Sequence, residues 1–211
     1  MLDHAARRLT GPPLDRLAVR VAARGVPATA ITGAGWLVGV GACLAVLAQW
    51  WNLALVLWLL NRTLDGLDGA VARQHGATDL GGFLDLLADF SIYAGLVLAV
   101  AVAVPDARLA CVALLLAYYL SGTAFLTLSS ILERRGSDRH NDARSLRFVG
   151  GLAEGTETVI AYVLITLLPQ HAATIAWIFA AVVAVTALQR TAEGVVVLRE
   201  QPTARPAAPT P

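Results

Sequence analysis

Residues 61–93 read NRTLDGLDGAVARQHGATDLGGFLDLLADFSIY, and this stretch decides what kind of protein the chain forms. It places four aspartates, Asp65, Asp68, Asp85 and Asp89, inside two apolar segments on either side of a short polar connection. The first pair is spaced i,i+3 and the second i,i+4, so in helices each pair shares one face. An ionised carboxylate inside an apolar span is costly, and these aspartates are therefore candidates for function.

The composition around this stretch predicts an all-α integral membrane protein. Of the 211 residues, 57% are hydrophobic and only 15% are charged, whereas a soluble domain carries about 25% charged residues. A single aqueous core of this size could not bury so much apolar surface. The formal net charge is +1, so no basic excess points to a nucleic-acid partner. Cys43 and Cys111 lie in apolar runs and are expected to be free thiols.

Six apolar stretches are long enough to cross a bilayer as helices. We expect transmembrane helices over residues 28–48, 53–72, 81–104, 109–132, 150–168 and 172–197. The chain then divides into a cytoplasmic or interfacial segment at 1–27, a membrane domain at 28–200 and a disordered tail at 201–211. Trp50 and Trp51 follow the first span directly, where an interfacial aromatic belt would place them.

The segment 13–25 has the pattern of a short amphipathic helix ahead of the first span. Its apolar residues and its arginines recur on opposite sides, at Leu14, Leu17, Ala18 and Val21 and at Arg16, Arg20 and Arg24. Pro13 near the start and Gly25 near the end suit the two ends of a helix. Such a cationic helix is typical of one that lies in the membrane interface, and a solvated disordered leader is the alternative.

The arginines indicate the orientation, since cytoplasmic loops carry an excess of basic residues. Five arginines lie in residues 1–27, five between the fourth and fifth spans, one between the second and third, and two at the C-terminal end. The opposite side offers only Arg108, so we expect both termini in the cytoplasm. All sixteen basic residues are arginine, a bias typical of high-GC bacteria, and we therefore expect the inner membrane of a bacterium.

In an antiparallel hairpin the four aspartates would converge near the cytoplasmic face. At a rise of about 1.5 Å per residue, Asp68 and Asp85 lie about 6–8 Å deep and Asp65 and Asp89 about 12 Å deep. Four like charges need a counter-charge, which hard divalent cations bound through oxygen would supply. Two such ions would form a clamp suited to phosphoryl displacement. Close packing of small residues would explain the neighbouring glycines but not the aspartates.

The two halves of this hairpin resemble the signature of the CDP-alcohol phosphatidyltransferase family. That signature reads D-x2-D-G-x2-A-R, a spacer of eight residues, and then G-x3-D-x3-D. Here residues 65–73 read DGLDGAVAR and residues 81–89 read GGFLDLLAD, and the spacer at 74–80 has seven residues. The shorter spacer bears on how this connection meets a nucleotide and leaves the carboxylates in place. The six-helix topology of the family agrees with the six expected spans.

The resemblance implies an enzyme of phospholipid biosynthesis that depends on Mg²⁺ or Mn²⁺, with two ions expected. It would transfer a phosphatidyl or phosphoalcohol group from a CDP-linked donor, such as CDP-diacylglycerol, to an alcohol and release CMP. The implied metal ligands are Asp65, Asp68, Asp85 and Asp89, with Asp89 completing the metal site or acting as the base on the acceptor hydroxyl. The implied contacts to the CDP part come from Asp65, Gly69, Ala72, Arg73 and Gly81.

Charged residues in the second half of the chain are candidates for binding the acceptor, namely Arg144, Arg147, Glu154, Glu157 and Arg190. The alternative is that they pair with one another or that the glutamates favour a helix N-terminus. An ion-coupled secondary transporter is the competing function, because membrane carboxylates also mark ion pathways. Against it, the chain shows no inverted repeat and its acids gather at one end. Membrane lipids are expected partners, and a homodimer is left open.

Overall fold

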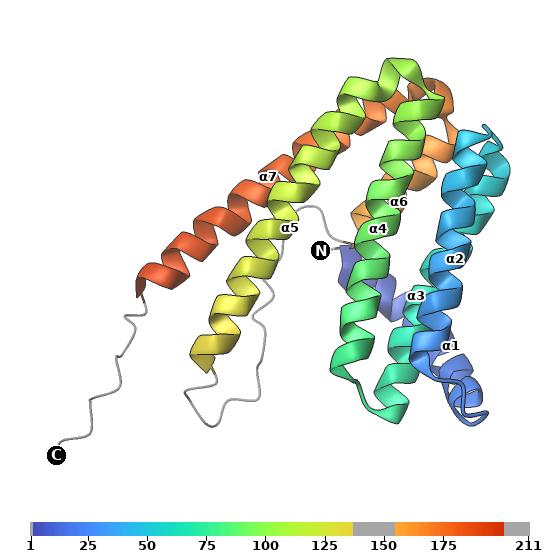
Figure 1. The fold of residues 1–211 in the computed structure, drawn as a ribbon, viewed down its shortest axis with the longest axis vertical. Helices are drawn as coiled ribbons and strands as arrows, with labels where there is room; N and C mark the ends of the chain where they lie inside the picture. Colours follow the sequence, from blue (N-terminus) through green and yellow to red (C-terminus); the bar gives the residue numbers. More distant parts are fainter. Residues whose placement is uncertain (1, 137–154, 201–211) are drawn as a thin grey trace.

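The computed structural model describes residues 2–136 and 155–200, and in these residues it contains helices and turns but no strand. The all-α class is therefore confirmed for the described part of the chain. The helices, shown in Figure 1, are α1 (Leu2–Ala22), α2 (Ala28–Leu47), α3 (Trp51–His75), α4 (Asp79–Ala103), η1 (Pro105–Ala107), α5 (Arg108–Gly136), α6 (Gly155–Leu167), η2 (Pro169–His171) and α7 (Ala172–Glu200).

Four of the described helical segments are long and apolar enough to cross a membrane. They are Ala28–Leu47, Asp79–Ala103, Pro105–Arg134 and Pro169–Arg199. Helix α3 carries two arginines and two aspartates, which lowers its hydropathy, and α6 is apolar but spans only 13 described residues. Residues 150–154, where the fifth span was expected to begin, lie outside the described residues. The structure agrees with a membrane protein, and the six-span count stays a prediction.

Two groups of helices make up the fold. Helix α2 packs along α3 and along α4, while α5 and α7 run side by side and lean away from that group, as Figure 1 shows. The groups join at the end of the molecule where η1 and η2 lie, and α6 contacts both α3 and α7. One hydrophobic core runs through both groups around Trp58, which is fully buried.

Small residues let α2 approach its neighbours closely. A Cβ atom added at Gly39 would lie 2.8 Å from the Ile92 side chain of α4 and 3.0 Å from Nδ2 of Asn61 on α3. A Cβ atom at Gly95 would lie 3.2 Å from the sulfur of Cys43. Between membrane helices such close approach replaces the hydrophobic driving force that water would supply. These contacts fix the position of α3 beside α4.

Helix α1 begins earlier than the sequence pattern predicts. We expected its start at Pro13, but the helix runs from Leu2 to Ala22 with Pro12 and Pro13 inside it. Leu14, Ala18 and Val21 of the expected apolar face pack against the second half of α3. The apolar pattern therefore marks the part of the helix that packs on α3 and not its first residue. The interfacial location of α1 stays a prediction.

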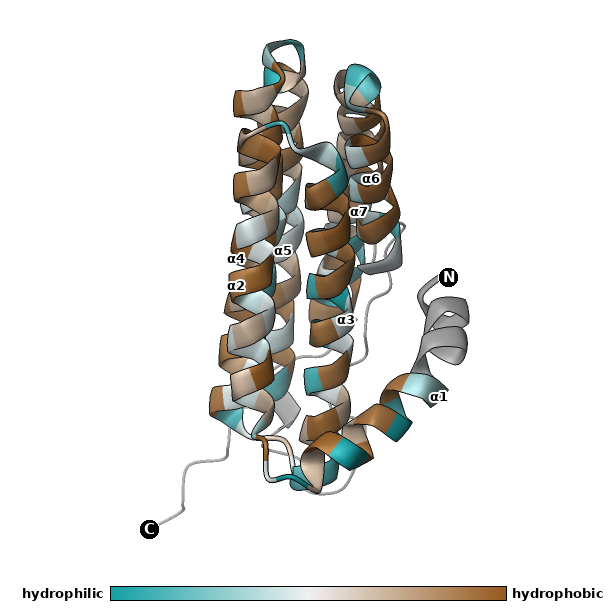
Figure 2. Ribbon diagram, turned by 90° about the vertical axis from the view of Figure 1, so that its right-hand side faces the viewer, coloured by the Kyte–Doolittle hydropathy of each residue, from teal (hydrophilic) through white to brown (hydrophobic). Residues whose placement is uncertain are grey.

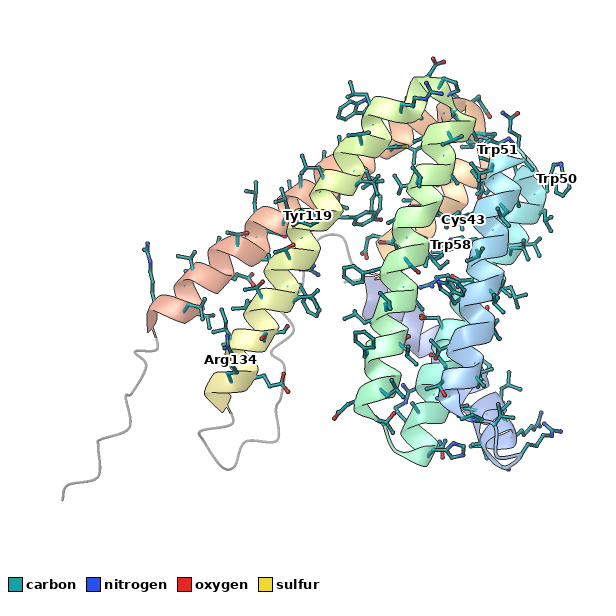
Figure 3. The ribbon with its side chains drawn as sticks, viewed as in Figure 1. Cys43, Trp50, Trp51, Trp58, Tyr119 and Arg134 are labelled. Atoms are coloured by element: carbon teal, nitrogen blue, oxygen red, sulfur yellow. The ribbon has the colours of Figure 1, made fainter. Side chains whose placement is uncertain are left out.

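Polar and apolar residues occupy different parts of the molecule along its long axis. Figure 2 shows apolar residues along the helices and hydrophilic residues at the turns and on α1. Trp50, 65% exposed, and Trp51 lie at the turn between α2 and α3, whereas Trp58 points between the helices and Arg134 lies at the opposite end of the molecule (Figure 3). This arrangement is the one expected for a tryptophan belt at one membrane surface and arginines at the other.

Candidate active site

The facing parts of α3 and α4 bring three of the four sequence-predicted aspartates together. Asp65, Asp68 and Asp85 each offer a carboxylate oxygen, and these three oxygens lie within 4.8 Å of one another. Asp68 is buried, with 5% of its surface exposed, and the other two are half-buried. We call these three residues the aspartate triad. Asp89 lies outside it.

The aspartate triad fits a hard divalent cation. Such an ion prefers oxygen ligands, and octahedral Mg²⁺ holds them at about 2.1 Å, which places neighbouring ligand oxygens about 3 Å apart and opposite ones about 4 Å apart. The three oxygens of the triad lie within 4.8 Å of one another, so the triad offers three hard ligands to one ion. The set contains no nitrogen or sulfur donor that would favour a softer metal.

Thr32 of α2 orients Asp68. Its hydroxyl oxygen lies 2.6 Å from Oδ2 of Asp68, to which it donates a hydrogen bond, and 3.1 Å from the Ala28 carbonyl oxygen. Both Thr32 and Asp68 are buried. Residues that hold a metal ligand in this way set its orientation and basicity. Sequence reasoning missed Thr32, because its only signal is a hydroxyl in an apolar span.

Arg62 of α3 binds Asp89, whose carboxylate also contacts that of Asp65 in the aspartate triad. Its Nη2 donates to Oδ1 of Asp89 over 2.8 Å, and its Nη1 lies 3.6 Å from Oδ2 of Asp65. Only 10% of the Arg62 side chain is exposed, against 26% for Asp89. The four aspartates therefore comprise a triad that can share one cation and a fourth carboxylate, beside the triad, that is paired with a guanidinium.

The motif glycines have unequal surroundings. A Cβ atom at Gly66 would lie 3.0 Å from the Leu14 side chain, so Gly66 makes room for α1. At Gly81 the backbone N–H donates to Oγ1 of Thr78, the N-cap residue of α4, over 3.1 Å. A Cβ atom there would lie 3.0 Å from the same oxygen. By contrast, a Cβ atom at Gly82 would meet nothing within 4 Å.

The shortened spacer forms a tight turn. Helix α3 continues to His75, three residues follow, and α4 begins at Asp79. Gly76 has φ of +92°, a backbone conformation that favours glycine. Arg73, the last residue of the first half-motif, is 65% exposed in its side chain, and its Nη2 lies 3.4 Å from Oδ1 of Asp15 on α1. The turn thus leaves Arg73 at the surface, where it pairs with Asp15.

The acceptor candidates are only partly described by the structure. Arg144, Arg147 and Glu154 lie outside the described residues. Glu157 is half-buried in the first turn of α6. Arg190 of α7 donates to the hydroxyl oxygen of Ser121 on α5 over 2.9 Å, and its guanidinium lies 5.3 Å from the centre of the Phe125 ring. The acceptor role of all five residues stays a prediction.

Comparisons with known proteins agree with the motif. The family model described as CDP-alcohol phosphatidyltransferase matches residues 26–188. The inner membrane protein YnjF of Escherichia coli (strain K12) is 39% identical over 190 residues, which cover 89% of this chain and 92% of that protein. Among solved structures, the Mycobacterium tuberculosis phosphatidylinositol phosphate synthase PgsA1 with CDP-DAG bound is similar in fold. The TM-score is 0.64 at 18% identity, and the match covers 86% of this chain and 92% of that one.

Proposed function

This chain belongs to the CDP-alcohol phosphatidyltransferase family, and we propose that it transfers a phosphatidyl or phosphoalcohol group from CDP-diacylglycerol to an alcohol with release of CMP. Membership of this family makes the protein a transferase of phospholipid biosynthesis. The observation that carries the proposal is the aspartate triad, whose three oxygens lie within 4.8 Å in the α3–α4 hairpin. The fold that this chain shares with a synthase described with CDP-DAG bound supports a lipid-linked donor.

We assign the metal site to the aspartate triad, with Mg²⁺ or Mn²⁺ as the ion and a second ion beside Asp89. When bound, the metal would neutralise charge on the pyrophosphate and on the departing CMP. The residues that contribute most directly are Asp68, buried and oriented by Thr32, and Asp65 and Asp85, which face it. The hard oxygen set and its close spacing support this assignment.

In the proposed reaction Asp89 is the base. The acceptor hydroxyl oxygen forms a bond to the phosphorus that carries the diacylglycerol, and the bond from that phosphorus to the CMP oxygen breaks. Asp89 takes the hydroxyl proton, a role that requires it to reach the acceptor. Its partial exposure and its position outside the triad support this role.

The contacts to the CDP part are assigned to the motif residues that surround the turn, Asp65, Gly69, Ala72, Arg73 and Gly81. The surface position of the Arg73 guanidinium supports its contact with a nucleotide that arrives from water. The acceptor pocket is assigned to Arg144, Arg147, Glu154, Glu157 and Arg190. An arginine-lined pocket favours a phosphorylated alcohol, and the glutamates favour a polyol or a cationic alcohol, so the acceptor is left to experiment.

We place the enzyme in the inner membrane of a bacterium, with six spans and with the site and both termini on the cytoplasmic side. The apolar helices and the name of the Escherichia coli relative support the membrane. The arginine distribution supports the orientation. A lipid-linked nucleotide would keep its acyl chains in the bilayer and its head group at this surface.

The test is CMP release by the purified protein from CDP-diacylglycerol in mixed micelles, with and without Mg²⁺ or Mn²⁺. Glycerol 3-phosphate, serine, inositol phosphate and phosphatidylglycerol are supplied in turn as acceptors. We expect release only with metal and with one acceptor class. Asp68→Asn should abolish turnover and Mn²⁺ binding, because it removes the buried ligand, whereas Asp89→Asn should abolish turnover and retain metal-dependent CDP binding.

Asp106→Asn is the matched control, since Asp106 is exposed in η1 at the far end of the molecule. Its turnover and Mn²⁺ affinity should equal those of the unmodified protein. Turnover that needs no divalent ion, or full activity of Asp68→Asn, would contradict the metal assignment. A transporter would move ions across vesicles without releasing CMP, so CMP release also separates the two function classes.

A further inference from the structure

Arg62 is held on three sides by hydrogen bonds. Its Nε donates to Oδ1 of Asn61 over 2.9 Å, its Nη1 to the hydroxyl of Tyr93 over 2.7 Å, and its Nη2 to Oδ1 of Asp89 over 2.8 Å. The family motif begins at Asp65, so Arg62 lies outside it, one helical turn earlier. A buried guanidinium with this many directed bonds has a fixed orientation.

Aromatic rings and a second helix fix the guanidinium further. Its central carbon lies 4.8 Å from the centre of the Trp58 ring and 4.9 Å from that of Tyr93. Asn61, which accepts from Arg62, donates its own Nδ2 to the Gly35 carbonyl of α2 over 2.9 Å. Contacts from α2, α3 and α4 therefore decide where the Arg62 guanidinium points.

The fixed positive charge of Arg62 lies next to the aspartate triad, where a metal ion would bind. A cation bound by three carboxylates attracts a fourth one nearby, and Arg62 competes for that fourth carboxylate at 2.8 Å. We propose that Arg62 is a positioning residue that binds Oδ1 of Asp89 and fixes the orientation in which this carboxylate, beside the triad, meets the acceptor hydroxyl. This inference rests on the proposed role of Asp89 as the base.

Arginine suits this task and lysine does not. The guanidinium is a planar fork that bonds Asp89, Tyr93 and Asn61 at once in fixed directions. A lysine ammonium carries all its donors on one atom at the end of a flexible stem. Arg62→Lys would therefore keep the charge near Asp89 and lose the direction.

A purely structural role for Arg62, as a strut between α3 and α4, makes different predictions. Loss of a strut would separate the helices, pull Asp85 away from Asp65 and Asp68, and weaken metal binding. Loss of a positioning residue would lower turnover and leave the triad intact. Removal of a positive charge 3.6 Å from Asp65 would even favour a bound cation.

The experiment compares Arg62→Met and Arg62→Lys by kcat, by KM for CDP-diacylglycerol and by Mn²⁺ affinity from electron paramagnetic resonance. We expect kcat of Arg62→Met to fall about 100-fold, the scale of a misplaced catalytic group. KM should change little, and Mn²⁺ affinity should be equal to or higher than that of the unmodified protein. Arg62→Lys should have an intermediate kcat. Arg108→Met, at an exposed arginine in the first turn of α5, is the matched control and should leave all three values unchanged.

A double-mutant cycle shows whether Arg62 acts through Asp89. The cycle compares the residual turnover that remains once Asp89 is replaced, and the variant with both Arg62→Met and Asp89→Asn should keep the same residual rate as Asp89→Asn alone, because the positioned group is already absent. Tyr93→Phe removes one bond to Arg62 and keeps the contact with Asp89, so it should retain most of kcat. Additive losses in the cycle, weakened Mn²⁺ binding in Arg62→Met, or a kcat of Tyr93→Phe as low as that of Arg62→Met would overturn the inference.

Different results would contradict the role of Asp89 as the base and the role of Arg62 as its positioning residue. Near-normal turnover of Asp89→Asn would remove Asp89 as the base and Arg62 as its positioning residue together. An inactive Asp89→Asn with a fully active Arg62→Met would remove only the inference about Arg62.

Discussion

Two of the four aspartates at the site have a neighbour outside the motif that orients them. Thr32 binds the buried carboxylate of Asp68, and Arg62 binds Asp89, which lies outside the triad. Neither Thr32 nor Arg62 belongs to the family motif that contains the four aspartates. Residues in such a second layer around metal ligands change affinity or activity about 10–100-fold when they are mutated. The chemistry of this site therefore depends on α2 and on the turn of α3 before the motif.

The variant Thr32→Val tests whether the Thr32 hydroxyl orients Asp68. Valine keeps the volume and removes the donor 2.6 Å from Oδ2 of Asp68, so the carboxylate loses its fixed orientation. We expect Mn²⁺ affinity to fall about tenfold, measured by titration in detergent. Thr63→Val is the matched control, because the Thr63 hydroxyl is exposed and bonds the Leu59 carbonyl within its own helix. Equal Mn²⁺ affinity in the two variants would contradict the role of Thr32.

At the scale of elements, the position of α3 beside α4 depends on the small residues of α2. Gly39 faces Ile92 of α4 and Asn61 of α3 at distances that leave no space for a methyl group. Asn61 in turn bonds Arg62. The close packing that stabilises the helices therefore also positions the residues of the site. A mutation that changes this packing is expected to change the site as well.

Gly39→Ala should destabilise the protein and lower its turnover. The added Cβ atom would lie 2.8 Å from the Ile92 side chain, so that side chain or the helices must shift, at a cost of about 1–3 kcal/mol. Thermal unfolding in detergent measures the loss. Gly33→Ala is the control on the same helix, since its Cβ atom meets nothing within 4 Å and should leave the melting temperature nearly unchanged. A melting temperature of Gly39→Ala equal to that of Gly33→Ala would show that α2 tolerates the wider spacing.

At the scale of the whole molecule, the two ends carry different residues. The exposed tryptophan Trp50 and the turn at η1 lie at one end, and the turn at 76–78 and Arg134 lie toward the other, with the aspartates nearer to the second. Because basic residues remain in the cytoplasm, this polarity predicts that the site faces the inside of the cell. Orientation is thus a condition for the proposed reaction.

Thiol labelling checks that orientation. In a background with Cys43→Ala and Cys111→Ala, one cysteine is introduced at a time, as Ala77→Cys in the α3–α4 turn or as Asp106→Cys in η1. A membrane-impermeant maleimide should label Ala77→Cys only in inside-out vesicles and Asp106→Cys only in intact spheroplasts, because the two positions lie at opposite ends of the molecule. The reverse pattern would place the site outside the cell and contradict the assigned topology.

Local properties of the sequence determined the class of protein and the identity of the carboxylates. Apolar runs predict membrane helices from length and composition alone, and the i,i+3 and i,i+4 spacings place each aspartate pair on one helix face. The sequence did not predict where α1 begins, and it did not settle whether the second and fifth apolar stretches cross the membrane. The ends of helices, and helices that carry both polar and apolar residues, depend on packing against neighbouring helices. The motif also supported the family before any contact was known.

Only the tertiary structure decided how the four aspartates divide. The resemblance left Asp89 either as a metal ligand or as the base, whereas the structure gathers Asp65, Asp68 and Asp85 and binds Asp89, beside them, to Arg62. It also brought Thr32, distant in the chain, onto Asp68. The physical reason is that the spacing of residues along a helix determines only which face of the helix a side chain occupies. Metal binding and hydrogen bonding depend on interatomic distances to about 1 Å. Those differences are set where α2, α3 and α4 pack together.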